Sequence, residues 1–169
     1  MRAPCRPAQI AAEAMLGKRD ALERGRITAR FEGDPVAREP VLFDPDELRA
    51  LIGELVENAA RALSGAPDAT LTVRATGHPV DPRRVVVVVR DNGPGIAPAL
   101  REELLTPLSG AGGLSGFGLH HARETAHRWL AELTLEDPVD GPGTEVRITL
   151  RACRIVDETT HPPNVEART

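Results

Sequence analysis

The sequence is poor in aromatic residues and has almost no lysine. Aromatic residues make up 2% of the 169 residues, with three Phe, one Trp and no Tyr. So few rings argue against a surface that stacks nucleic-acid bases, and the net charge of −4 argues against a phosphate-backbone binder. Lys18 is the only lysine, so the Gly-Lys-Ser/Thr of a P-loop is absent. We therefore expect no nucleic-acid partner and no P-loop.

Cysteines and long apolar runs are also scarce. Cys5 and Cys153 lie far apart, fit no metal-ligand spacing and suit free thiols in a reducing compartment. The N-terminus lacks the charged-then-apolar pattern of a signal sequence. The longest apolar stretch is far shorter than a membrane span. The sequence therefore predicts a cytoplasmic chain without direct membrane insertion.

The length and composition are those of one globular domain. A hydrophobic fraction of 41% in 169 residues is enough for a core that needs no disulfide or metal. We expect a linker or helix over residues 1–25, with residues 1–9 loose, and one domain over residues 26–152. The polar residues 153–169 contain a proline pair and are expected to be a disordered tail.

The order of predicted elements determines the expected fold class. Helices are predicted over residues 10–25, 43–65, 97–105 and 117–130, and strands over residues 26–33, 69–77, 83–91, 131–138 and 144–152. This order lacks the regular βαβ alternation of a doubly wound parallel sheet. It favours an α/β (α+β) two-layer sandwich, in which about three helices cover one face of a mixed, mainly antiparallel sheet. The uninterrupted run Val85–Val89 predicts a strand buried on both faces.

The long helix over residues 43–65 carries a polar strip beside its apolar stripe. At about 100° per residue, the apolar residues that gather on one side are Leu48, Leu51, Ile52, Leu55, Ala59 and Leu63. Glu54, Asn58 and Arg61 follow at i, i+4 and i+7 on the neighbouring side. One interpretation is a solvated flank with an ordinary charge pair. The other is a nucleotide site, since a carboxylate polarises water, an amide oxygen ligates Mg²⁺ and a guanidinium holds phosphate.

Two glycine-rich segments allow a similar choice. Asp91-Asn-Gly after the valine run is typical of a plain turn. A carboxylate ending a buried strand also needs hydrogen-bond donors, and the exocyclic amine of adenine is one. Gly93 and Gly95 would leave room for a planar base. Gly116 and Gly118 begin a predicted helix, whose free N–H groups attract anions, although glycine-rich loops are often only flexible.

Four segments together resemble a known superfamily. In chain order, "ELVENAAR", "DNGPGI", "GGLSGFGL" and "GPGTEVRITL" resemble the N box, the two glycine boxes and the terminal Gly-Thr strand of the GHKL superfamily. That superfamily includes histidine kinases, type II topoisomerases, mismatch-repair ATPases and some anti-sigma kinases, which share the Bergerat ATP-binding fold. The resemblance covers residues 26–151 and is strongest to the catalytic domain of bacterial sensor histidine kinases.

The resemblance implies ATP and Mg²⁺ as cofactors and gives each motif residue a role. Glu54 and Asn58 are the implied catalytic residues, with Asn58 as the Mg²⁺ ligand and Glu54 as the acid that activates a water. The implied cofactor-binding residues are Asn58, Arg61, Asp91, Gly93, Gly95, Ile96, Gly116, Phe117, Gly118, Leu119 and Thr144. Among them, Asp91 holds the adenine amine, Gly95 lies beneath the base, and the Thr144 hydroxyl supports the adenine end. Arg61, Gly116 and Gly118 approach the phosphates under a lid over residues 109–115.

The sequence departs from the histidine-kinase pattern in three places. "LLTPL" replaces the usual Phe-rich segment, the lid is short and without lysine, and "GFGLHH" replaces Gly-Leu-Gly-Leu. About 25 residues precede the first predicted strand, too few for a dimerisation hairpin. The histidines fall in turn, helix and tail positions, which favours surface or packing roles over a phosphoacceptor role: His78, His120, His121, His127 and His161. For His120 and His121, which adjoin the implied phosphate site, a lid or phosphate role stays open.

The leading hypothesis is a Mg²⁺-dependent kinase domain. It would bind ATP and ADP and hand the γ-phosphate to a histidine on a dimerisation domain supplied elsewhere, with a response regulator downstream. One alternative is an anti-sigma-type serine kinase that sequesters a protein partner. Another is a nucleotide-binding interaction module without turnover.

Overall fold

The computed structural model describes residues 4–105 and 115–153. Its helices are α1 (Pro7–Gly17), α2 (Arg19–Arg24), the 3₁₀ helix η1 (Pro35–Arg38), α3 (Pro45–Ala62), α4 (Pro98–Leu105) and α5 (Ser115–Arg128). Its strands are β1 (Thr28–Gly33), β2 (Thr70–Gly77), β3 (Arg84–Asp91), β4 (Glu132–Glu136) and β5 (Thr144–Arg151). The predicted lid over residues 109–115 lies outside the described residues except for Ser115, and so does the tail after Cys153.

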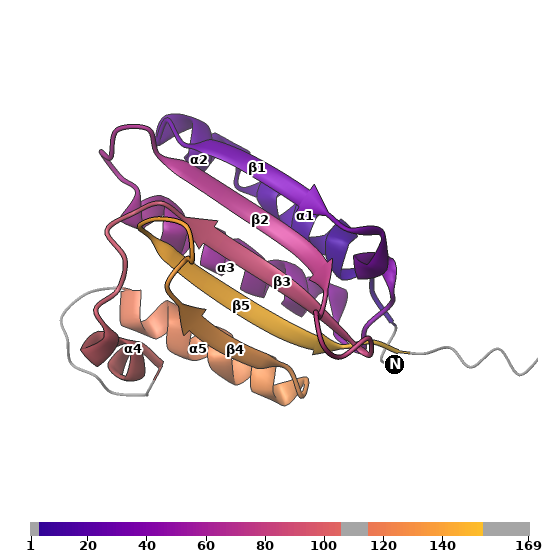
Figure 1. The fold of residues 1–169 in the computed structure, drawn as a ribbon. Helices are drawn as coiled ribbons and strands as arrows, with labels where there is room; N and C mark the ends of the chain where they lie inside the picture. Colours follow the sequence, from indigo (N-terminus) through magenta and orange to yellow (C-terminus); the bar gives the residue numbers. More distant parts are fainter. Residues whose placement is uncertain (1–3, 106–114, 154–169) are drawn as a thin grey trace, which may run out of the picture.

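The strands form one five-stranded sheet with helices on a single face (Figure 1). The strand order is β1-β2-β3-β5-β4, with β1 parallel to β2 and all other pairs antiparallel. Helices α1, α3 and α5 cover the same face of the sheet. The predicted two-layer sandwich with a mixed, mainly antiparallel sheet is therefore confirmed.

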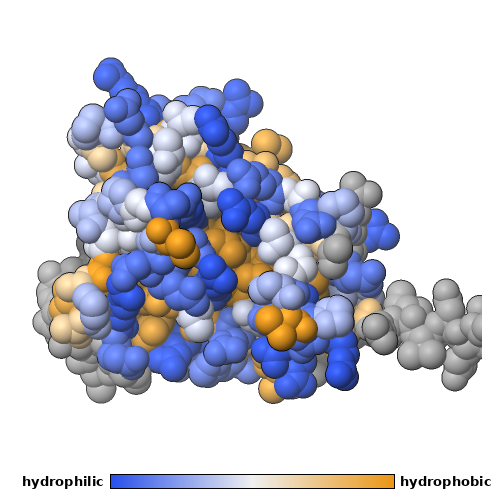
Figure 2. Space-filling model, in the orientation of Figure 1, coloured by the Kyte–Doolittle hydropathy of each residue, from blue (hydrophilic) through white to orange (hydrophobic). Residues whose placement is uncertain are grey.

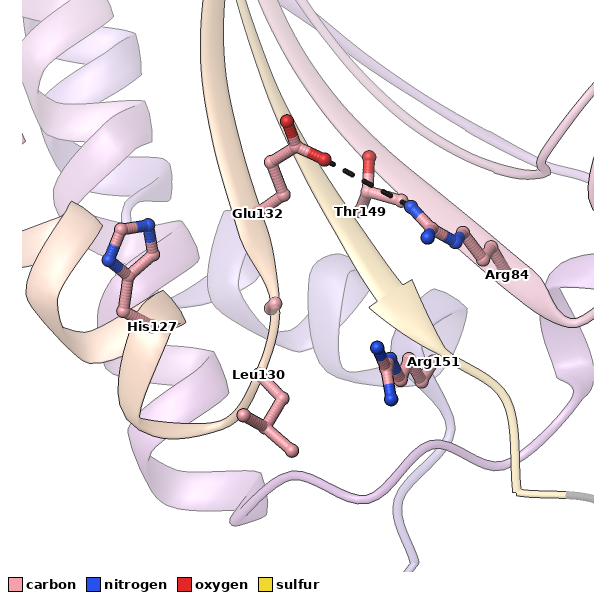
Figure 3. Close-up of a pocket in the computed structure, with 7 residues that line it drawn as sticks. Arg84, His127, Leu130, Glu132, Thr149 and Arg151 are labelled. Carbon is pink, nitrogen blue, oxygen red and sulfur yellow. Dashed lines mark ion pairs between the residues drawn. The ribbon is translucent and has the colours of Figure 1, made fainter.

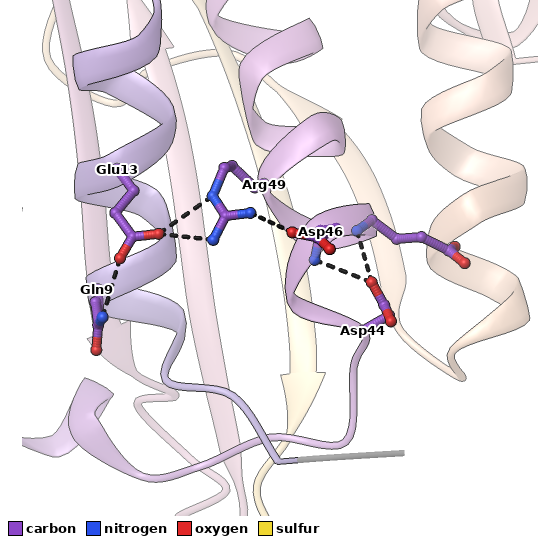
Figure 4. Close-up of polar contacts among 6 residues, drawn as sticks. Gln9, Glu13, Asp44, Asp46 and Arg49 are labelled. Atoms are coloured by element: carbon purple, nitrogen blue, oxygen red, sulfur yellow. Dashed lines mark hydrogen bonds and ion pairs between the residues drawn. The ribbon is translucent and has the colours of Figure 1, made fainter. Parts of the chain in front are cut away.

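Helix α3 begins at a well-formed cap and contacts α1 through charged groups. The Asp44 carboxylate accepts hydrogen bonds from the N–H groups of Asp46 and Glu47, at 2.9 and 3.0 Å. Pro45 occupies the first turn, where its missing N–H costs nothing. The Arg49 guanidinium joins Asp46 on its own helix to Glu13 on α1 (Figure 4). These contacts fix the position of the helix that carries the polar strip.

The core forms between α3 and the helix-facing side of the sheet. The predicted apolar stripe of α3 is confirmed, because all six of its residues are buried. On β3, alternate valines Val85, Val87 and Val89 belong to the same core. Burying side chains of this size stabilises the fold by about 1.5–3 kcal/mol each.

The other two valines of β3 are buried without a second layer of helices. Val86 and Val88 are only 4% and 8% exposed, although they point to the open face of the sheet. By register, Val88 lies between Arg74 and Arg147, whose guanidiniums are held by acidic side chains. The long stems of such residues cover apolar surface. This face is therefore mostly hydrophilic, with small apolar areas between polar side chains (Figure 2).

The N-terminal residues are better ordered than predicted. Cys5 forms a β-bridge with Val41, which bridges Ala152 at the end of the sheet, and α1 begins at Pro7. The prediction that residues 1–9 are loose is therefore wrong for residues 5–9. The single predicted helix over residues 10–25 is interrupted at Lys18, after Gly17. The boundary at residue 25 stays a prediction, but Ile10, Ala11 and Ala14 belong to the core.

Among the described residues, no helix is long and apolar enough to cross a membrane.

The two free thiols should differ in reactivity. Burial, together with the nearby charge of Asp44, raises the pKa of the Cys5 thiol to about 11, and the residue is only 7% exposed. Burial also raises the pKa of Cys153, which is half-buried. Because the thiolate is the reactive form, iodoacetamide at pH 8 should modify Cys153 well before Cys5. Peptide mass spectrometry over time measures this order, and both thiols should react at similar rates in guanidinium chloride. Equal rates in the native protein would contradict the burial of Cys5.

Candidate functional site

A small cavity lies between α3 and the end of β3. Its volume is about 190 Å³, below the 300–1,000 Å³ typical of sites for drug-sized ligands, so it suits one flat ring system. Its apolar walls include Leu55, Ala59, Val89, Leu104, Leu135 and Val146. The predicted site residues that line it are Asn58, Asp91, Gly95, Ile96, Leu119 and Thr144.

Asp91 is the one carboxylate among the described residues that line this cavity. It ends β3, is 6% exposed, and accepts hydrogen bonds from the N–H groups of Gly93 (2.8 Å) and Thr144 (3.3 Å). Burial raises the pKa of Asp91, and the two N–H donors partly oppose the shift. Both donors act on Oδ1. The site therefore presents a held acceptor group beside an apolar slot, which suits a planar ligand with an N–H donor.

Close backbone approach holds the turn around Asp91. A Cβ on Gly143 would lie 1.8 Å from the Asp91 carbonyl oxygen, so only glycine fits there. Gly95 has φ +76°, and a Cβ on it would lie 3.1 Å from the Gly143 carbonyl oxygen. A Cβ on Gly93 would meet Asp91 Oδ1 at 2.9 Å. These glycines therefore permit the protein's own close packing, a requirement additional to the predicted room for a base.

The polar strip of α3 meets the first turns of α5. A Cβ on Gly118 would lie 3.0 Å from both Asn58 Nδ2 and Glu54 Oε1. The other carboxylate oxygen of Glu54 lies 3.3 Å from Nδ1 of His121. Gly116 and Phe117 also belong to the first turns of α5, as predicted. The strip therefore faces a helix N-terminus rather than bulk solvent alone.

Asn58 joins the two parts of the site. It lines the cavity, and its Oδ1 accepts a hydrogen bond from the Arg61 guanidinium. Its Nδ2 is buried and has no hydrogen-bond partner among the described residues. Leaving such a group unpaired costs about 1–3 kcal/mol. Asn58 is thus the polar group of the site whose hydrogen bonding is incomplete.

The oxygen atoms of the polar strip suit a cation that takes most of its ligands from a bound phosphate group and water. No group of three or more His, Cys, Asp and Glu side chains that could hold a metal occurs among the described residues. Mg²⁺ commonly takes one or two protein oxygens and completes its shell with phosphates and water. The Asn58 amide oxygen, beside the Glu54 carboxylate, fits that pattern.

The remaining predicted residues lie beside the cavity rather than on its wall. Glu54 and Arg61 flank Asn58 on α3, Gly93 donates to Asp91, and Gly118 packs on the strip. His120 Nε2 lies 3.4 Å from Glu124 Oε1 on the same helix, and His120 Nδ1 lies 3.4 Å from the Leu105 carbonyl oxygen, as expected of a packing residue. His121 was also expected at the surface, and its contact with Glu54 adds it to the polar end.

A larger cavity of about 430 Å³ lies at the other end of β3 and β5 (Figure 3). By register, Arg84 and Arg151 lie opposite each other there, seven residues along β3 from the Asp91–Thr144 pair. Arg84 Nη1 lies 4.0 Å from Glu132 Oε2. The described lining of this larger cavity contains none of the predicted site residues, so its size alone does not make it the candidate site.

Some site residues were missed from the sequence. Gly143 is the last residue of the Gly-Pro-Gly turn in "GPGTEVRITL", and such a turn directly before a predicted strand was the available signal. Leu104 and Leu135 come from α4 and β4 and carry no motif. Arg101, whose guanidinium donates to the Ile96 carbonyl, gave no signal either.

Comparison with known proteins connects this geometry with one family. Residues 43–154 match the family described as "Histidine kinase-, DNA gyrase B-, and HSP90-like ATPase". The chain is 36% identical over 101 residues to the sensory histidine kinase/phosphatase NtrB of Vibrio alginolyticus, covering 55% of this chain and 29% of the relative. It is 28% identical over 121 residues to the sensor protein kinase PmrB of Pseudomonas aeruginosa, covering 69% and 24%. The chain thus spans less than a third of either relative.

Two solved structures share the fold. The catalytic domain of the histidine kinase ThkA matches with a TM-score of 0.76 and 18% identity, over 89% of this chain and 97% of that one. The mycobacterial sensor histidine kinase MprB matches with a TM-score of 0.71 and 23% identity, over 90% and 98%.

Asp91→Asn should separate stability from binding. The raised pKa of Asp91 favours folding below the unfolded pKa, and this contribution is lost as the pH rises through the folded pKa. At pH 7 the ionised carboxylate therefore costs stability. Asparagine keeps the Oδ1 acceptor without the charge, so the variant should have an unchanged or higher Tm in calorimetry, with the gain shrinking toward pH 4. ADP binding, followed by titration calorimetry, should fall strongly. A lower Tm with normal ADP binding would contradict this assignment.

Gly118→Ala should weaken binding without unfolding the protein. Alanine favours a helix over glycine by up to about 1 kcal/mol, so the Tm should hold. The added Cβ would push Glu54 and Asn58 away, and we expect the ADP dissociation constant to rise about tenfold. Gly17→Ala is the matched control, because nothing lies within 4 Å of its Cβ and α1 ends there. Equal affinities in the two variants would show that the contact with the strip is unimportant.

Proposed function

Because the chain belongs to the histidine kinase-, DNA gyrase B- and HSP90-like ATPase family, we propose that it binds ATP with Mg²⁺ and donates the γ-phosphate to a histidine of a separately supplied dimerisation domain. One observation carries the proposal: Asn58 lines the apolar cavity that ends at Asp91 and also meets Gly118 at the start of α5. A site for a flat base and a site for phosphates and a cation are thereby continuous.

The base binds in the cavity. The Asp91 carboxylate accepts a hydrogen bond from the exocyclic amine of adenine, and the Thr144 hydroxyl supports the same edge of the base. The apolar walls from α3, β3 and β5 exclude water, which strengthens the hydrogen bond to the carboxylate. Since the fold has already buried Asp91, the base does not have to desolvate it again.

The phosphates bind at the polar strip and the first turns of α5. Asn58 would hold Mg²⁺, which supplies charge neutralisation at the phosphate oxygens when bound. Because Arg61 donates to Asn58 Oδ1, the atom that would hold the cation, binding of a cation there would free the guanidinium for a phosphate. The N–H groups of the first turn of α5 add partial positive charge.

Phosphoryl transfer follows from positioning. The imidazole nitrogen of the acceptor histidine forms a P–N bond as the bond from the γ-phosphorus to the ADP oxygen breaks, and ADP leaves. Glu54 accepts the proton that the attacking group loses. We place this reaction in the cytoplasm, where the chain's two free thiols persist, with a response regulator as the later phosphate acceptor.

Mixing the chain with labelled Mg·ATP and a histidine-bearing dimerisation domain tests the reaction. We expect a labelled acceptor whose phosphate is lost in acid and kept in base. Acid-stable phosphoserine on a protein partner would instead identify the serine-kinase alternative, and tight binding without any product would identify the interaction module.

Asn58→Ala should remove the Mg²⁺ dependence of binding. In the unaltered chain, Mg²⁺ should tighten ATP binding by at least about tenfold, whereas in the variant the Mg²⁺-free affinity should persist and the gain should vanish. Glu57→Gln is the matched control, since Glu57 is one residue away and pairs with Lys18 instead. Titration with and without Mg²⁺ measures this difference, and an unchanged Mg²⁺ effect in Asn58→Ala would exclude Asn58 as the ligand.

A further inference from the structure

Arg101 connects two walls of the base cavity from outside it. The residue lies on α4, and its guanidinium donates through both Nε and Nη2 to the Ile96 carbonyl oxygen, at 3.1 Å each. The same Nη2 bonds the Asp137 carboxylate, directly after β4. Arg101 is not among the residues that line the cavity, but Ile96 is.

The two ends of this connection adjoin different parts of the cavity lining. Ile96 follows Gly95, the glycine with φ +76° in the turn after β3. Asp137 follows the end of β4, where Leu135 lines the cavity. Leu104, one helical turn after Arg101 on α4, also lines it. One side chain therefore fixes three segments that have no strand pairing with one another.

The connection is well suited to hold a fixed geometry. The Arg101 side chain is 21% exposed, so most of it is packed, and the planar guanidinium loses little freedom when it forms several bonds. Hydrogen bonds with a charged partner are about twice as strong as neutral ones. Its hydrogen bond also holds the pKa of the Asp137 carboxyl below the ordinary value, so the pair stays charged at neutral pH.

We propose that Arg101 is a positioning residue that sets the width of the base cavity by tying the turn at Ile96 to the end of β4 at Asp137. Loss of the tie lets the two walls separate, so the base is held less tightly and discriminated less well from other bases. The hydrogen bonds of Arg101 to described residues go to neither α3 nor α5, which carry the proposed phosphate end. This inference rests on the proposed nucleotide binding.

The test compares ADP and GDP affinities in four proteins by titration calorimetry. Arg101→Ala should raise the ADP dissociation constant about 5- to 10-fold and leave GDP within about twofold, so adenine discrimination falls. Asp137→Asn should give a smaller change in the same direction. Arg74→Ala is the matched control, since Arg74 also pairs with one acid, Glu32 at 2.8 Å, on the open sheet face. It should leave both affinities unchanged.

Further variants separate positioning from simple loss of folding. Arg101→Lys keeps a charge for Asp137 but cannot make the paired bonds to Ile96, so it should recover discrimination only in part. In the double variant Arg101→Ala/Asp137→Asn, the two effects should not add, because both break one connection. If the unaltered chain does not bind ADP, the proposed function fails. If it binds ADP, and Asp91→Asn does not, while Arg101→Ala, Arg101→Lys and Asp137→Asn keep normal discrimination, the positioning proposal alone is overturned.

Discussion

The site depends on the close approach of two backbone segments, where the end of β3 meets the turn before β5. Gly143 approaches the Asp91 carbonyl so closely that no side chain fits, and the next residue, Thr144, donates its N–H to the Asp91 carboxylate. The strand register then pairs Asp91 with Thr144 directly. If this close approach were lost, the Asp91 carboxylate would lose its orientation and the Thr144 N–H donor. The last residue pair between β3 and β5 would also be lost.

The same close approach explains why the Asp91 carboxylate can remain buried before any ligand binds. A carboxylate removed from water is costly, and the raised pKa of Asp91 reflects that cost. The fold offsets part of it with two fixed N–H donors, and the apolar core of α3 and β3 supplies the stability that carries the rest. Because folding has already removed most water from Asp91, a ligand would form the hydrogen bond without paying most of this desolvation cost, as expected of a preorganised site.

Local patterns in the sequence predicted the parts of the site that lie on one element. The helical period was enough to place Glu54, Asn58 and Arg61 beside the apolar stripe, and the valine run was enough to bury Asp91. Residues that act through distant contacts left no such trace. Arg101 reaches residues 5 and 36 positions away, and nothing local distinguishes it from other surface arginines. The N-terminus was underestimated for the same reason, because Cys5 is ordered by Val41, far along the chain.

The proposed base end and the proposed phosphate end rest largely on different segments of the chain but share α3 and, through Leu119, α5. The proposed base end is built from strand ends and turns, which close glycine packing and the hydrogen bonds of Arg101 join. The proposed phosphate end relies on α5, whose first turns contact α3 through Gly118 and the Glu54–His121 pair. Since α3 is capped at Asp44 and buried along one side, it serves as the fixed reference for both ends. Because α5 also carries Leu119 of the cavity wall, a shift of α5 would change both the proposed phosphate site and the proposed base site, so the fold couples the two.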